Sequence, residues 1–137
     1  MAEVSIADFG HHAAVSSSRH SRTVAEEAYA HFDCGTAWAR IGAYEQALES
    51  WRDALCLAPD LADAYAASGS VYMVLGCWQE AVRSYQKAIQ AAPDLLGSYY
   101  GLGSAYGRLG EYGNAIEAYE HAFQLLPPEP EVLQRLP

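Results

Sequence analysis

Basic residues are few in this sequence. Its 137 residues include 8 lysines and arginines against 17 aspartates and glutamates, which gives a net charge of −9. Such a surface repels the phosphate backbone of a nucleic acid, and no cluster of basic residues offsets that repulsion. The composition therefore predicts that nucleic acid is not a partner.

Long apolar runs are missing as well. The longest uninterrupted apolar stretches span only a few residues, whereas a membrane-spanning helix needs about 20. The N-terminal stretch up to Thr23 has neither a basic start nor an apolar centre, so it is unlike a secretory signal. We therefore expect a cytoplasmic protein that does not insert into a membrane.

Cysteine is scarce and widely spaced. The three cysteines are Cys34, Cys56 and Cys77, an odd number without a CxxC pair. This arrangement supports neither a disulfide framework nor a zinc site. We interpret them as small packing residues in a reducing compartment, with a free thiol of redox function as the alternative.

What the sequence does contain is a repeat with a period of about 34 residues. Several columns of small, aromatic or turn-forming residues return at this step without an insertion. They are Gly42, Gly76, Gly110; Pro59, Pro93, Pro127; Ala47, Ala81, Ala115; Trp51, Tyr85, Tyr119; Ala54, Ala88, Ala122; Gly35, Gly69, Gly103; and Trp38, Tyr72, Tyr106.

These columns predict a pair of helices in each unit. Ala47, Trp51 and Ala54 follow the spacing i, i+4, i+7, which places them on one face of an α-helix. Gly42 separates the two helices at a point where a left-handed or tight backbone is needed. Pro59 ends the second helix, and Asp60 or its equivalent Asp94 is placed to cap the helix that follows.

A helix–turn–helix unit of about 34 residues with this pattern resembles the tetratricopeptide repeat family. The resemblance covers three units, residues 28–61, 62–95 and 96–129. It implies an all-α fold, an α-α superhelix in which helical hairpins stack into a right-handed solenoid. One hairpin cannot bury its apolar face alone, so each unit must stack on the next.

Both ends extend beyond the repeats. The sequence TVAE, from Thr23 to Glu26, is a capping box, so the repeat domain is expected to span 23–137. Residues 1–22 read as a flexible N-terminal arm. Residues 130–137 suggest a short C-terminal helical stub. Either this stub or another chain is expected to cover the apolar residues Phe123, Leu125 and Leu126.

Catalytic patterns are not found. The glycine-rich stretch 101–110 lacks the spacing and the GK[ST] of a phosphate loop, and in repeat register it falls inside a helix. Three of the five histidines, His11, His12 and His20, lie in the N-terminal arm, and His31 and His121 have no nucleophile beside them in sequence. We therefore predict a protein that is not an enzyme, with no catalytic residue, no metal site and no cofactor.

The resemblance implies a concave binding groove lined by the first helix of each unit. The positions that it implies are Tyr29, Phe32, Thr36, Ala39 and Arg40 in the first unit, Asp63, Ala66, Ser70, Met73 and Val74 in the second, and Gly97, Tyr100, Ser104, Gly107 and Arg108 in the third. The predicted ligand-binding residues among them are Phe32, Thr36, Arg40, Ser70, Met73, Tyr100, Ser104 and Arg108.

Three features of this groove matter for its ligand. Some tetratricopeptide proteins grip the C-termini of heat-shock chaperones with groove lysines and asparagines. This chain has one lysine, Lys87, and one asparagine, Asn114, and neither is at a groove position. A row of hydroxyl residues, Thr36, Ser70 and Ser104, which we call the hydroxyl row, recurs where some relatives carry asparagine. Gly101 and Gly107 leave the third inner wall bare, which fits either close approach of a ligand backbone or a loose helix.

The sequence thus predicts a non-enzymatic protein–protein interaction module. It would hold a peptide or helical segment of a partner in its groove and act as an adaptor or scaffold. Two alternatives stay open. One is a secretion-type chaperone for a single dedicated client. The other is a self-assembling scaffold, a homo-oligomer formed through the C-terminal end.

Overall fold

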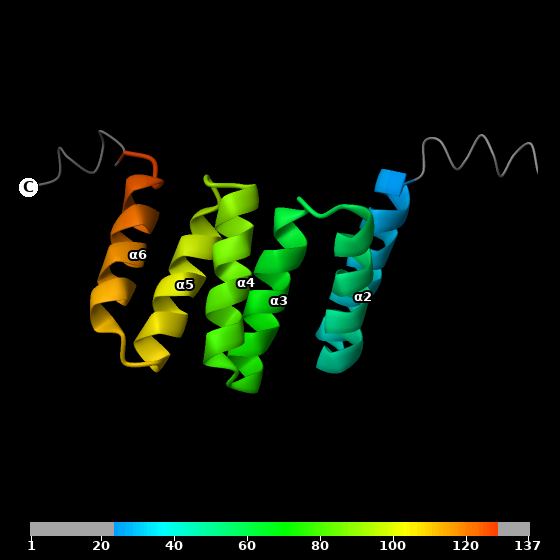
Figure 1. Ribbon diagram of the computed structural model, residues 1–137, viewed down its shortest axis with the longest axis horizontal. Coiled ribbons are helices and arrows are strands. Elements are labelled where there is room, and N and C mark those ends of the chain that lie inside the picture. The colour runs from blue at the N-terminus through cyan, green and yellow to red at the C-terminus, as the bar shows by residue number, and fades with distance from the viewer. Residues whose placement is uncertain (1–23, 129–137) are drawn as a thin grey trace, which may run out of the picture. The chain divides into compact units, whose positions relative to one another are not determined.

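The computed structural model describes residues 24–128, and all of its regular elements are helices (Figure 1). The predicted N-terminal arm, the Thr23 side of the capping box and the predicted C-terminal stub lie outside the described residues. The chain divides into two compact units at Leu61 and Ala62, which is also where the first predicted repeat ends.

The first unit contains one helical hairpin. A helix covers residues 24–40 and is followed by α2, Tyr44–Leu57. Ala47, Trp51 and Ala54 are the buried residues of α2, as their spacing predicted. The indole Nε1 of Trp51 donates a hydrogen bond to the carbonyl oxygen of Phe32 at 3.1 Å, which ties the two helices together.

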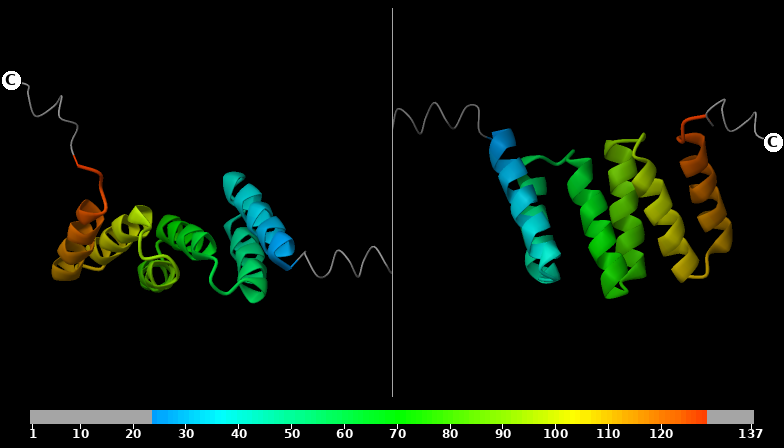
Figure 2. Two further views of the ribbon diagram at one scale, coloured as in Figure 1. Left: turned by 90° about the horizontal axis from the view of Figure 1, so that it is seen from above. Right: turned by 180° about the vertical axis from the view of Figure 1, so that it is seen from behind.

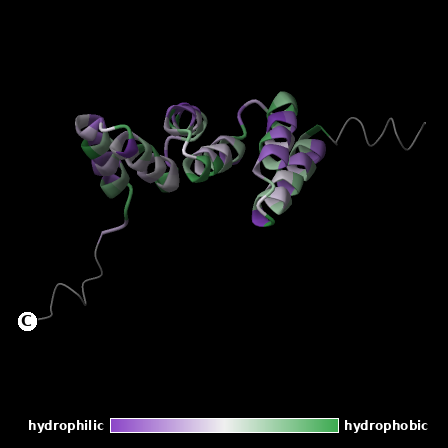
Figure 3. Cartoon of the chain, turned by 90° about the horizontal axis from the view of Figure 1, so that it is seen from below, coloured by the Kyte–Doolittle hydropathy of each residue, from purple (hydrophilic) through white to green (hydrophobic). Residues whose placement is uncertain are grey.

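The second unit contains two hairpins. Its helices are α3 (Ala62–Leu75), α4 (Trp78–Ala91), α5 (Leu96–Arg108) and α6 (Tyr112–Gln124). Each helix packs on the next in the chain, and α3 also contacts α5 (Figure 2). The core cluster lies between α4, α5 and α6 and is made of Ala81, Val82, Tyr85, Leu102, Ala105 and Ala118. In Figure 3, α3 is coloured more hydrophobic than α4.

The turn glycines have the predicted conformation. Gly42, Gly76 and Gly110 have φ angles of 81°, 76° and 78°, in the left-handed region that side chains disfavour. The prolines also lie where helices end, because α2 ends at Leu57 and α4 at Ala91, each two residues before its proline. The glycine-rich stretch that begins at Gly101 is helical up to Arg108, so it is not a phosphate loop.

The predicted aspartate cap of α5 is wrong. Leu95, not Asp94, is the N-cap residue of α5, and no side chain makes a capping hydrogen bond there. Instead, the backbone N–H of Ser98 bonds to the Leu95 carbonyl at 3.1 Å. The first turn of α5 also has no acidic residue, so its backbone N–H groups face no compensating charge within that turn.

Candidate functional site

The predicted hydroxyl row is bonded to the helices around it. Thr36 Oγ1 donates to the Phe32 carbonyl at 3.0 Å, and Ser70 Oγ donates to the Ala66 carbonyl at 3.2 Å. Ser70 Oγ also lies 3.1 Å from Tyr85 Oη. Ser104 Oγ lies at the same distance from Tyr119 Oη. The row therefore joins the two helices of a repeat at the second and third units.

Tyr85 is held in a desolvated place. Its side chain is 5% exposed, and this burial raises the pKa of its phenol, while the hydrogen bond with Ser70 lowers it by less. Because Ser70 gives its proton to the Ala66 carbonyl, Tyr85 donates to Ser70. The lone pairs of Tyr85 Oη are then left as acceptors.

The other predicted ligand-binding residues divide between the two units. Phe32 and Arg40 belong to the first unit with Thr36, and the structure brings Phe32 within 6.4 Å of the Trp51 ring, measured between centroids. In the second unit, Met73 packs on the core cluster. The guanidinium of Arg108 lies over the Trp78 ring at 5.3 Å, so both of these side chains have structural contacts of their own.

Tyr100 is the most accessible of the predicted aromatic residues. It is 62% exposed and meets the Tyr119 ring edge-on, with 5.4 Å between the ring centroids. A large exposed ring at this position is available to a ligand. Tyr100 also lines one of the hollows of the second unit.

A different hollow of the second unit, which we call the polar hollow, lies between α3 and α5. Its volume is about 220 Å³. Most of its polar groups are oxygens that can accept a hydrogen bond, from Asp63, Ser70, Tyr85 and Ser98. The full lining is Asp63, Ala66, Ala67, Ser70, Tyr85, Leu95, Gly97 and Ser98.

Ser98 is the unusual member of the polar hollow. It is 1% exposed, and its Oγ has no hydrogen-bond partner among the described residues. An unpaired buried hydroxyl costs about 1–3 kcal/mol of folding free energy, and a ligand that hydrogen-bonds to Ser98 would remove this cost. The equivalent residue one repeat earlier is Ala64, which is fully buried.

The hollow that Tyr100 lines, which we call the apolar hollow, lies between α5 and α6. Its volume is about 350 Å³. Its outer side chains are well exposed, with Phe123 at 69% and Leu126 at 46%. Gly97 lines both hollows, and no atom would lie within 4 Å of a Cβ there. The lining is Leu96, Gly97, Tyr100, Tyr119, Ala122, Phe123 and Leu126.

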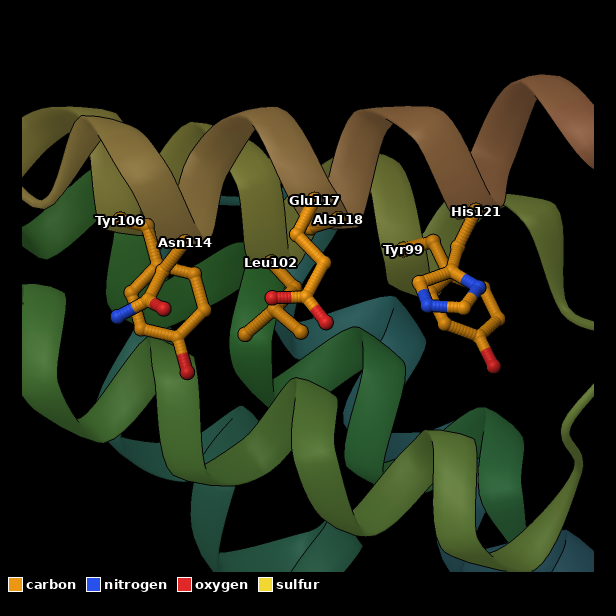
Figure 4. Close-up of a pocket in the computed structure, with 7 residues that line it drawn as sticks. All are labelled: Tyr99, Leu102, Tyr106, Asn114, Glu117, Ala118 and His121. Atoms are coloured by element: carbon orange, nitrogen blue, oxygen red, sulfur yellow. The ribbon is translucent and has the colours of Figure 1, made fainter.

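A third hollow, of about 180 Å³, lies on the other side of α5 (Figure 4). Tyr99 and His121 stack there with 5.3 Å between their ring centroids. Asn114, from α6, lies beside Tyr106 at the opposite end of this hollow, and Glu117 lies between the two ends (Figure 4). The Tyr106 hydroxyl accepts a bond from Gln86 Nε2 at 3.0 Å. No serine, threonine or cysteine is among the described residues that line this hollow.

No group of three or more metal-ligating side chains comes together in residues 24–128. All three cysteines are free thiols, and Cys34 and Cys56 are exposed. Within the same range, no helix has both the length and the apolar character that crossing a bilayer requires.

Two contributors to the site were missed by sequence reasoning. Ser98 stands in a column where the previous repeat has alanine, and that exchange of a small apolar residue for a polar one was the available signal. Phe123 was noted only as an end residue, although it lines the same hollow as Tyr100. Conversely, Gly101 does not leave a bare wall, because the Tyr85 ring fills the space beside it. Gly107 does have open space.

Solved structures with the same fold are numerous. The second tetratricopeptide domain of Spaghetti (RPAP3), bound to the HSP90 peptide SRMEEVD, has a TM-score of 0.74 and 20% identity, over 78% of this chain and 99% of that one. The N-terminal domain of stress-induced protein-1 from C. elegans has a TM-score of 0.72 and 18% identity, over 82% and 93%.

A crystal structure of MamA has a TM-score of 0.71 and 28% identity. The match covers 74% of this chain but only 59% of MamA. No curated protein matches the sequence. The family model described as tetratricopeptide repeat matches residues 60–127. The helical hairpins and the positive-φ turn glycines agree with these matches: residues 60–127 belong to the tetratricopeptide repeat family, and the described helices share the fold of the solved structures.

Proposed function

We propose that this chain is a non-enzymatic adaptor that holds a segment of a partner protein across the polar and apolar hollows of its second unit. The tetratricopeptide fold is a protein-interaction fold, and a related domain holds a peptide. The observation that carries the proposal is Gly97, where a hydroxyl-rich hollow and an aromatic one meet beside open space. Specific binding commonly combines such apolar anchors with a few placed polar groups.

The proposed site differs from the predicted one in part. Tyr100 and Ser70 stay in it, although Ser70 already bonds to Tyr85. Ser104 bonds to Tyr119 and lines neither hollow. Phe32, Thr36 and Arg40 belong to the first unit and line neither hollow, so they stay predictions from the sequence. Met73 and Arg108 are the weaker members, since the core cluster and Trp78 already engage them. Neither a nucleic acid nor a cofactor enters the proposal, and a cytoplasmic location stays a prediction from the sequence.

The test is affinity capture from an extract of the source cell with two matched glycine variants. Gly97→Leu places a side chain where the two hollows meet, in open space, so the fold is preserved. Gly113→Leu is the control, because Gly113 is likewise the second residue of its helix and also has open space, but lines neither hollow. Loss of a partner only with Gly97→Leu supports the groove. Equal capture by all three proteins refutes it.

A self-assembling scaffold is the second candidate function. It is favoured by Phe123, Leu125 and Leu126, which are 69%, 39% and 46% exposed at the end of α6. Apolar residues exposed together mark interaction surfaces. Light scattering over a hundredfold range of concentration tests this candidate. A mass that rises to a multiple of 14.9 kDa supports it, and a constant monomer excludes it. Capture of one dominant client would favour the chaperone alternative instead.

A further inference from the structure

The chemistry of the two hollows indicates which kind of segment they accept. Among residues 24–128, Asp63 is the only charged residue that lines either hollow. It is exposed, and its carboxylate has no ion pair within the described residues. A ligand that places a negative charge in the polar hollow would meet this carboxylate and the net charge of −9.

The hydroxyls of the polar hollow point to the same conclusion. Ser70 gives its proton to the Ala66 carbonyl, and Tyr85 gives its own to Ser70. The Tyr85 oxygen therefore offers lone pairs to a ligand, as the Asp63 carboxylate does. Ser98 adds a buried hydroxyl without a partner. A lysine ammonium or an arginine guanidinium, which only donates hydrogen bonds, complements this set of acceptors.

The first turn of α5 and the apolar hollow indicate what lies next to the cation in the ligand. The first turn of α5 lacks a capping side chain and an acidic residue, which suits a peptide carbonyl next to that cation. Beyond Gly97 the apolar hollow is lined by rings and leucines, including Tyr100 and Phe123, so the next part of the ligand is apolar.

We infer that the groove of the second unit selects a partner segment with a lysine or arginine next to a large apolar side chain, the cation seated at Asp63 and Ser98. This inference rests on the proposed function. The inferred preference for a basic segment differs from the peptide bound by the related domain. That peptide, SRMEEVD, has three acidic side chains and one basic.

The experiment measures fluorescence anisotropy with defined peptides in 150 mM salt, which screens distant charges. One labelled peptide is GKLFKLG with an amidated C-terminus. The second has glutamate in place of both lysines, and the third is SRMEEVD. We expect the basic peptide to bind at least about tenfold more tightly than either acidic one.

Two aspartate variants separate the site from the overall charge. Asp63→Asn should weaken binding of the basic peptide by about threefold, as for a partly exposed ion pair. Asp53→Asn, an exposed aspartate of α2 in the other unit, should leave the affinity unchanged. Thermal melts accompany both variants, since Asp63 lies in the first turn of α3 and also complements its helix dipole.

The other outcomes overturn the inference in distinguishable ways. Equal weakening by both aspartate variants would show attraction to the overall charge alone. Tighter binding of an acidic peptide, lost with Gly97→Leu, would refute the charge selection and keep the groove. If no peptide binds, the selection is wrong as stated. The proposed function fails separately, when captured partners persist with Gly97→Leu.

Discussion

The ring of Tyr85, on α4, occupies the space that a side chain at Gly101 of α5 would need. A Cβ atom at Gly101 would overlap the ring atoms of Tyr85. This contact joins the second repeat to the third, because Tyr85 also bonds to Ser70 of its own repeat. Gly101 is therefore required for packing between repeats, not for the approach of a ligand.

Gly101→Ala should destabilise the protein even though alanine favours a helix. Overpacking typically costs about 1–3 kcal/mol, which exceeds the roughly 1 kcal/mol that alanine gains over glycine. Gly97→Ala, in open space on the same helix, should instead stabilise by up to about 1 kcal/mol. Urea unfolding followed by circular dichroism compares the two. Equal shifts in the same direction would contradict the packing role of Tyr85.

Alkaline unfolding should depend on Tyr85. Burial raises the pKa of its phenol in the folded state, so above about pH 10 the unfolded chain loses this proton while the folded one keeps it. The stability that Tyr85 contributes is thus fully present below that pH and falls as the pH rises further. Tyr85→Phe should flatten this fall and also cost about 0.5–1.5 kcal/mol at neutral pH.

The control for this titration is Tyr112→Phe. Tyr112 is 68% exposed, so replacing it with phenylalanine removes no buried hydroxyl and should leave the stability at neutral pH unchanged. Thermal melts between pH 8 and 11 compare both variants with the wild type. A Tyr85→Phe protein whose stability falls as steeply as that of the wild type would show that its phenol is not the group responsible.

Trp51→Phe should destabilise the first unit by about 2 kcal/mol. The change removes the hydrogen bond to the Phe32 carbonyl and leaves a void where the indole meets Gly35. Trp38→Phe is the matched control, because Trp38 is 38% exposed and Trp51 only 2%. If the two variants unfold at the same urea concentration, the indole of Trp51 is not the link between these helices.

The repeat period made much of the fold predictable. It located the turn glycines, the helix ends and the buried faces of the second helices, because each depends on residues close in sequence. It also found the column of Gly69 and the column of Tyr85. It did not show that the Tyr85 ring packs against Gly69, where an added Cβ would lie only 2.9 Å from the ring. That pairing depends on how the two helices of a hairpin meet.

The candidate site was less accessible to sequence reasoning. A column assigns Ser70 and Ser104 to one face, but not the tyrosine hydroxyls that already occupy them. It places Arg108 beside Tyr100 without showing that the guanidinium lies on Trp78. The hollows around Gly97 depend on the volumes of side chains from four helices, α3 to α6, which the repeat period does not encode.

The most direct test of the proposed groove is photocrosslinking from a single aromatic position in the source cell. p-Benzoylphenylalanine would replace Tyr100, which lines the apolar hollow, or Tyr112, which lines neither hollow and is exposed to a similar extent. The proposed function predicts a covalent adduct with a partner from position 100 and none from position 112. Adducts from position 112 alone, or equal yields from both, would contradict it.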